Sequence, residues 1–227
     1  MSKIKSFLKW IGSNIFFILL IDQLSKLYIK TNFVLGESID VFNWFKILFI
    51  ENEGAAWGAK LSDIFPISDS VGKLVLTIFR LFAIIGIGYW LYDIIKKQTS
   101  KTYVLAVTLI FAGALGNILD SVFYGTLFDS SNGQVATLFA DEPYGSIFYG
   151  KVVDMLYFPM IDTTLPDWLP FFGGDRFRFF EPVFNLADMA ISTGVGILIV
   201  FNKRVFGQKE DNLTSTLEEN DQTSLNE

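Results

Sequence analysis

Long apolar runs alternate with shorter mixed segments along the chain. Four of these runs, at about residues 7–28, 71–94, 103–119 and 184–201, are apolar almost throughout. A helix needs about 20 apolar residues to cross the hydrocarbon core of a bilayer, so each run is close to that length. The pattern therefore predicts an α-helical integral membrane protein with four transmembrane helices.

The first of these runs has features of a secretory signal peptide, because basic residues precede an apolar stretch. However, a cleavage site of small residues is missing, and the helical pattern continues through "DQLSKLYIK" at residues 22–30. We interpret this run as an uncleaved first span.

The two long segments between the predicted spans differ from ordinary linkers. Residues 30–70 alternate apolar and polar positions around Gly and Asn, which indicates short strands and turns. Residues 120–183 are rich in aromatics, Gly and Pro, a composition equally compatible with loose loops whose aromatics, such as Trp168, lie at the lipid headgroups. We expect a small extracytoplasmic β-rich subdomain with extended outer loops.

Basic residues near the span ends predict the orientation. They precede the first span, fill the loop between the second and third, and follow the fourth: Lys3, Lys5, Lys9, Lys96, Lys97, Lys101, Lys203, Arg204 and Lys209. With four spans all three groups lie on one side, which the positive-inside rule makes cytoplasmic. Both termini are then cytoplasmic, and segments 30–70 and 120–183 face outward.

The chain divides on this basis into two parts. Residues 1–206 form the membrane domain, whereas the acidic, polar residues 207–227 are typical of a disordered cytoplasmic tail. Hydrophobic residues make up 51% of the chain and mean hydropathy is +0.41, which agrees with a membrane protein. The net charge is −6 and no basic stripe indicates nucleic-acid binding.

The composition also limits the chemistry. The sequence has no Cys and no His, which excludes thiol nucleophiles, Ser-His triads and imidazole-bound zinc. Any hydrolytic reaction would use carboxylates or a Ser-Lys pair.

The predicted topology brings the unusual polar residues into one layer near the outer leaflet. They occupy the outer ends of the first, third and fourth spans and the outer segment between the last two: Asp22, Lys26, Asn117, Asp120, Asp154, Asn185 and Asp188. Ionisable residues inside a membrane usually face a bundle interior or a cavity and are candidates for function.

Each of these residues also has a structural interpretation. Asp22 and Lys26, four positions apart, would pair on one helix face. Asn117 would form an interhelical hydrogen bond where Gly113 and Gly116 allow close packing. Asn185 would cap the fourth span, and Asp120 would cap a helix or orient a neighbour. Asp154 and Asp188 would be helix-terminus charges.

Asp154 and Asp188 would also form a catalytic pair if they lie close together. Neighbouring carboxylates do not both ionise easily, so one keeps a proton while the other is charged. The ionised group accepts a proton from water as it attacks an amide carbon, and the protonated group donates to the carbonyl oxygen. Ser25 with Lys26 is the alternative pair, but adjacent residues on a helix do not face each other.

Five short motifs containing these residues resemble those of the lipoprotein signal peptidase (signal peptidase II) family. In order they are "DQLSK" (22–26), "NEGAAWG" (52–58), "GALGNILD" (113–120), "GKVVDM" (150–155) and "FNLAD" (184–188). Each motif alone is weak evidence for the family. Five motifs in the same order and at a consistent membrane depth are specific to it.

The resemblance implies roles for individual residues. The family's catalytic Asp residues lie in its V-V-D and F-N-x-A-D motifs, which implies Asp154 and Asp188 here. The supporting positions that shape the site and contact substrate or inhibitor match Asp22, Lys26, Asn52, Gly54, Asn117, Asp120 and Asn185.

Two features depart from the family pattern. Ser121 follows Asp120 where the family usually has Arg, so an Arg contact is lost or supplied elsewhere, with Arg176 and Arg178 as candidates. The segments at about 126–148 and 157–180 are insertions relative to compact members. They would form a lid or a surface for a partner, or would have no function of their own. Both catalytic carboxylates are present, so we expect an active enzyme.

The resemblance implies an aspartic endopeptidase of the bacterial inner membrane. Its substrate would be a diacylglyceryl-modified prolipoprotein, cleaved just before the lipidated Cys, without a metal or organic cofactor. Membrane lipids and cyclic lipopeptide inhibitors of the globomycin type would be further partners. A proton-coupled transporter is a rival interpretation, but its carboxylates would more naturally lie at mid-membrane, often within repeats. A non-catalytic lipoprotein-binding relative is another, for which Ser121 is the only hint.

Overall fold

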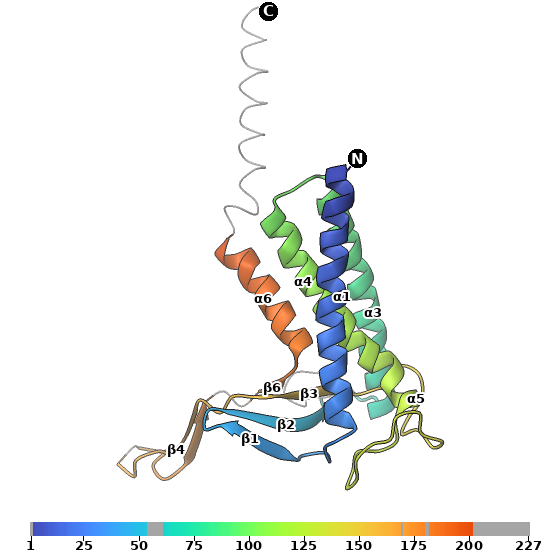
Figure 1. The fold of residues 1–227 in the computed structure, drawn as a ribbon. Coiled ribbons are helices and arrows are strands. Elements are labelled where there is room, and N and C mark those ends of the chain that lie inside the picture. The colour runs from blue at the N-terminus through green and yellow to red at the C-terminus, as the bar shows by residue number, and fades with distance from the viewer. Residues whose placement is uncertain (1, 54–60, 169, 180–181, 202–227) are drawn as a thin grey trace, which may run out of the picture.

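The computed structural model describes residues 2–53, 61–168, 170–179 and 182–201. Gly54 and the predicted tail at 207–227 lie outside these residues. The described helices are α1 (Ser2–Lys30), α2 (Leu61–Ile64), α3 (Asp69–Lys96), α4 (Lys101–Leu119), η2 (Asp120–Tyr124), α5 (Gly125–Leu127) and α6 (Leu186–Val200). The long helices α1, α3 and α4 run beside one another, with α6 against α4 (Figure 1).

Among the described residues, three helical segments are long and apolar enough to cross a membrane: Lys5–Lys30, Asp69–Lys96 and Lys101–Leu127. They coincide with the first three predicted spans. The fourth predicted span falls on α6, which is apolar but has 15 residues, fewer than the about 20 that a perpendicular span needs. Ser68 and Ser100 cap the N-termini of α3 and α4 by accepting hydrogen bonds from backbone N–H groups.

A small antiparallel sheet lies across one end of the helices (Figure 1). Its order is β1 (Ser38–Phe42), β2 (Phe45–Asn52), β3 (Val152–Tyr157) and β6 (Val183–Phe184). A separate hairpin joins β4 (Ile161–Thr164) to β5 (Arg176–Phe179). The predicted β-rich segment at 30–70 is therefore confirmed, and its central strand β2 pairs with a strand from the second outer segment.

The first insertion, at about 126–148, packs against this sheet and the end of α1. Phe128 and Ala136 are buried in one apolar cluster with Phe49 of β2 and Ile29 of α1. The buried Lys30 ammonium forms an ion pair with Glu51 and donates to Ser131 Oγ at 3.0 Å. This part of the second outer segment therefore consists of loops that are anchored by a few buried residues.

Close packing of α4 against α6 sets the position of the polar residues. A Cβ atom at Gly113 would overlap the carbonyl oxygen of Ala187, and one at Gly116 would lie 2.7 Å from Asp22 Oδ2. These two glycines therefore allow α6 and α1 to approach α4 closely, as the packing interpretation predicted.

Candidate active site

The two predicted catalytic carboxylates come from different elements that meet beneath the helices. Asp154 lies in β3 and is 3% exposed, while Asp188 lies in the first turn of α6. Because Asp154 belongs to a strand, its interpretation as a helix-terminus charge is wrong. Asp188 does lie in the first turn of a helix, as that interpretation predicted.

Asn185 links the two carboxylates. Its side-chain Nδ2 donates to Asp154 Oδ1 at 2.7 Å, and its backbone N–H donates to Asp188 Oδ2 at 3.3 Å. Its Oδ1 accepts from the backbone N–H of Asp188 at 2.9 Å, which completes a capping box at the start of α6. The predicted cap is confirmed, and the same side chain also holds the carboxylate of the neighbouring strand.

Asn117 of α4 makes a second link. Its Nδ2 donates to Asp188 Oδ1 at 2.7 Å, while its Oδ1 accepts from Asn185 Nδ2 at 3.1 Å and from Lys26 Nζ at 2.9 Å. The amide orientation is thereby determined, since its oxygen faces two donors and its nitrogen faces a carboxylate. Asn117 connects the carboxylate pair to α1.

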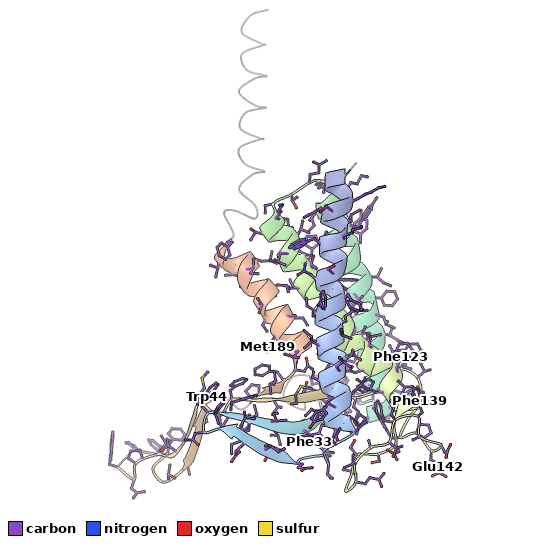
Figure 2. The ribbon with its side chains drawn as sticks, in the orientation of Figure 1. Phe33, Trp44, Phe123, Phe139, Glu142 and Met189 are labelled. Carbon is purple, nitrogen blue, oxygen red and sulfur yellow. The ribbon has the colours of Figure 1, made fainter. Side chains whose placement is uncertain are left out.

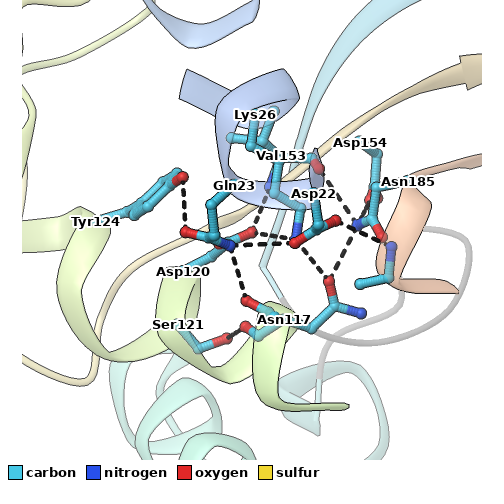
Figure 3. Close-up of polar contacts among 12 residues, drawn as sticks. Asp22, Gln23, Lys26, Asn117, Asp120, Ser121, Tyr124, Val153, Asp154 and Asn185 are labelled. Carbon is cyan, nitrogen blue, oxygen red and sulfur yellow. Dashed lines mark hydrogen bonds and ion pairs between the residues drawn. The ribbon is translucent and has the colours of Figure 1, made fainter. Parts of the chain in front are cut away.

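Lys26 lies at the centre of a buried charge cluster (Figure 3). Its Nζ is 3.0 Å from Asp22 Oδ2 and 2.8 Å from Asp120 Oδ2, and all three side chains are fully buried. The predicted pairing of Asp22 with Lys26 is confirmed. The other oxygen of Asp22 accepts from the backbone N–H of Ala187 at 2.9 Å, so the cluster also ties α1 to α6.

Asp120 orients its neighbours, as one interpretation predicted. Its Oδ2 lies 3.4 Å from the backbone nitrogen of Val153, which donates to it, next to Asp154 in β3 (Figure 3). Asp120 therefore connects the end of α4 to the strand that carries a predicted catalytic residue.

Gln23 and Tyr124 belong to this network but were not predicted from the sequence. Gln23 Nε2 donates to Asp120 Oδ1 at 2.9 Å, and Gln23 Oε1 accepts from the Tyr124 hydroxyl at 3.3 Å (Figure 3). Gln23 is polar within an apolar span, a signal that was available beside Asp22. Tyr124 had no comparable signal, because aromatic residues are frequent throughout its segment.

Asn52, at the end of β2, donates from Nδ2 to Asp154 Oδ2 at 3.2 Å. Burial and, to a smaller extent, the charge of Asp188 raise the pKa of Asp154 to about 7, although the hydrogen bonds from Asn52 and Asn185 act in the opposite direction. The environment of Asp154 thus favours its protonated form. Gly54, the other supporting residue predicted in this motif, lies outside the described residues.

Ser121 accepts a hydrogen bond from an arginine on another helix. Arg80 Nη1 of α3 lies 3.3 Å from Ser121 Oγ, which itself donates to the carbonyl of Asn117 at 3.1 Å. The Arg80 guanidinium also interacts electrostatically with Asp188, Asp154 and Asp120. The side chains of Arg176 and Arg178, predicted as alternatives, lie outside those described.

The Ser-Lys alternative has no geometric support in these elements. Ser25 Oγ donates to the carbonyl of Asp22 at 2.7 Å on its own helix, and Lys26 Nζ is occupied by the two carboxylates and Asn117. Among the residues that the structure describes, no group of three or more Asp and Glu side chains is arranged to hold a metal ion.

Comparisons with known proteins agree on one family. The family model of Signal peptidase (SPase) II matches residues 14–203. A lipoprotein signal peptidase of Porphyromonas gingivalis is 43% identical over 197 residues, covering 85% of this chain and 82% of the relative. The corresponding protein of Amoebophilus asiaticus is 37% identical over 191 residues, with 81% and 73% covered. That of Staphylococcus aureus is 30% identical over 207 residues, with 89% and 94% covered.

A solved structure with a similar fold is described as a bacterial membrane enzyme determined by the in meso method. It superposes with a TM-score of 0.54 at 25% sequence identity, covering 86% of this chain and 92% of the other. The helices and the sheet described above are thus arranged in a fold similar to that of a bacterial membrane enzyme.

Proposed function

The chain belongs to the signal peptidase II family, and we propose that Asp154 and Asp188 are the catalytic pair with which it removes signal peptides from prolipoproteins. The observation that carries the proposal is the shared hydrogen bonding of the two carboxylates. Asn185 donates to both, and Asn117 donates to Asp188 and accepts from Asn185. A strand residue and a helix residue are thereby held as one unit.

The surroundings of the two carboxylates support different roles for them in this proposal. Asp154, whose protonated form is favoured by burial and by the charge of Asp188, donates its proton to the scissile carbonyl oxygen. Asp188, at a helix N-terminus, is the ionised partner that accepts a proton from the attacking water. The proton gained by Asp188 then passes to the leaving amine as the C–N bond breaks. Asp154 takes back a proton from a hydroxyl of the tetrahedral diol as the new carboxyl group forms, so the pair returns to its starting state.

The substrate in this proposal is a diacylglyceryl-modified prolipoprotein, cleaved just before the lipidated Cys. The chain lies in the bacterial inner membrane with four spans, of which α6 is the fourth, and with both termini in the cytoplasm. The site is then near the outer leaflet, where acyl chains remain in lipid while the scissile bond meets water. Residues 1–206 form the peptidase domain, and residues 207–227 form a cytoplasmic tail.

The strands next to the site support an extended substrate backbone. β2 and β3 lead to Asn52 and Asp154, so a peptide lying along them brings its scissile bond to the pair. A cyclic lipopeptide of the globomycin type would occupy the same place, between membrane lipid and the carboxylates. Asp22, Lys26, Asp120 and Asn117 hold the helices at the positions that this arrangement requires.

The direct test is cleavage of a lipidated precursor by purified enzyme. Asp154→Asn and Asp188→Asn are each expected to lower the rate by about 10²- to 10⁴-fold or more, because each removes a proton acceptor or donor. Ser25→Ala is the matched control and is expected to retain activity. The hydrogen bond described for Ser25 Oγ goes to the backbone of its own helix, at the carbonyl of Asp22. Normal cleavage by either Asp variant would refute the aspartic mechanism.

A further inference from the structure

Helix α3 carries a polar face on an otherwise apolar span. Lys73, Thr77 and Arg80 are spaced four and three residues apart, which places them on one side of the helix. Lys73 Nζ donates to the carbonyl of Glu53 at 2.7 Å, and Thr77 Oγ1 donates to the carbonyl of Phe148 at 3.0 Å. This face therefore contacts the segments that surround the carboxylate pair.

Arg80 is the member of this face that lies nearest to the proposed chemistry. Its neighbours Phe79 and Phe82 are 67% and 69% exposed, as expected of side chains that face lipid. Arg80 instead turns inward, is partly buried and donates to the buried Ser121 hydroxyl. Since a guanidinium is costly in hydrocarbon, its inward position indicates an electrostatic partner.

The charges around the pair identify that partner. Besides the pair itself, three helices contribute ionisable groups to this region: Asp22 and Lys26 from α1, Asp120 from the end of α4, and Lys73 and Arg80 from α3. Glu53, whose carbonyl accepts from Lys73, also pairs with Lys151 at 3.5 Å. Lys26 is balanced by its contacts to Asp22 and Asp120. Arg80 interacts electrostatically most strongly with Asp188, then with Asp154.

We propose that Arg80 is a positioning residue that keeps the Asp154–Asp188 pair singly ionised by holding a guanidinium, anchored on Ser121, beside the charged carboxylate. This inference rests on the proposed function. The negative charge stays on the pair while one proton enters from water and another leaves to the substrate carbonyl, so a fixed cation stabilises the pair throughout. Ser121 is small enough to let the Arg80 side chain approach from α3 at the position where the family usually has Arg.

The test is the pH dependence of kcat/KM for a lipidated precursor. In Arg80→Gln the pair loses its neighbouring cation, so its singly ionised form is less favoured and the acidic limb of the pH profile moves to higher pH. We expect a shift of about one pH unit, which corresponds to about tenfold lower activity on that limb. Arg80→Lys keeps the charge and should retain the wild-type limb. An unchanged acidic limb in a folded Arg80→Gln enzyme would overturn the proposal.

A second pair of variants separates charge from packing. Arg80→Ser alone should shift the acidic limb of the kcat/KM profile as Arg80→Gln does. The double variant Arg80→Ser with Ser121→Arg should restore this limb, because it supplies a guanidinium from position 121 instead of position 80. A folded double variant that behaves like Arg80→Ser alone would contradict the proposal. If the wild-type enzyme itself fails to cleave the precursor, the proposed function fails, whereas an active wild type with an insensitive Arg80 overturns this inference alone.

Discussion

Asp154 shows how single residues set the chemistry of this site. Its carboxyl group is buried in β3, receives hydrogen bonds from Asn52 and Asn185, and lies within the field of Asp188. Burial and the neighbouring charge both favour the neutral acid, whereas the amide donors favour the anion. The proton of Asp154 is therefore retained up to about pH 7, where the pKa of this group lies.

This balance predicts a specific pH response. Activity should fall as the pH rises through about 7, because Asp154 then loses the proton that it donates. Asn52→Ala removes a hydrogen bond that stabilises the anion, so it should raise the pKa of Asp154 and move the alkaline limb upward by about one unit. The measurement is kcat/KM against pH for both enzymes. A limb that moves to lower pH in Asn52→Ala would contradict this account.

At the scale of elements, the contact between α4 and α6 determines the distance between Asn117 and Asp188. Gly113 faces the carbonyl of Ala187, at the start of α6, without room for a side chain. The hydrogen bond from Asn117 Nδ2 to Asp188 Oδ1 crosses the same contact one helical turn away. The close packing of α4 against α6 therefore also sets the geometry of the site.

Gly113→Ala should disturb both the packing of α4 against α6 and the geometry of the site. The added methyl group overlaps the Ala187 carbonyl, so we expect a loss of about 1–3 kcal/mol in stability and a fall in activity as Asn117 and Asp188 move apart. Gly196→Ala, in α6, is the control, since a Cβ atom there meets nothing within 4 Å and Ala favours the helix. Thermal unfolding in detergent and precursor cleavage measure both effects. Equal behaviour of the two variants would disprove the packing argument.

At the scale of the whole molecule, the outer layer is a structural core of its own. The sheet, the end of α1 and the insertion at 126–148 share one apolar cluster around Phe49 and Phe128, and the buried Lys30 joins Glu51 to Ser131 beside it. The Lys30 ammonium also lies 5.1 Å from the centre of the Phe128 ring. The insertion therefore supports the strands that lead to the proposed catalytic pair.

Two phenylalanines of the insertion make this testable. Phe128 is 0% exposed, so Phe128→Ala should destabilise the protein by about 3–5 kcal/mol through the cavity it leaves. Phe139, which is 76% exposed and lies at the rim of the molecule in Figure 2, serves as the control, and Phe139→Ala should change stability little. Similar melting temperatures for Phe128→Ala and the wild type would show that the insertion is not part of the core.

The sequence by itself determined the helices and the candidate carboxylates. Apolar runs of span length are a local property, and the polar residues at their ends follow from the order in which the runs cross the membrane. Asn117, Asn185 and Asp188 could be named on that basis, with Asp154 from the outer segment between the last two spans. Asn52 and the catalytic assignment of the two carboxylates came from the resemblance to the family. The strands around β2 were also predictable, because alternation of apolar and polar residues is local too.

Only the tertiary structure decided which residues meet. Gln23, Tyr124 and Arg80 joined the network through contacts between residues 41 to 101 positions apart, and no local pattern encodes such separations. The strand position of Asp154 and the packing of the insertion likewise depend on pairing across the chain. Burial by distant segments sets the pKa of Asp154, so its proton-bearing role became visible only once the fold was known.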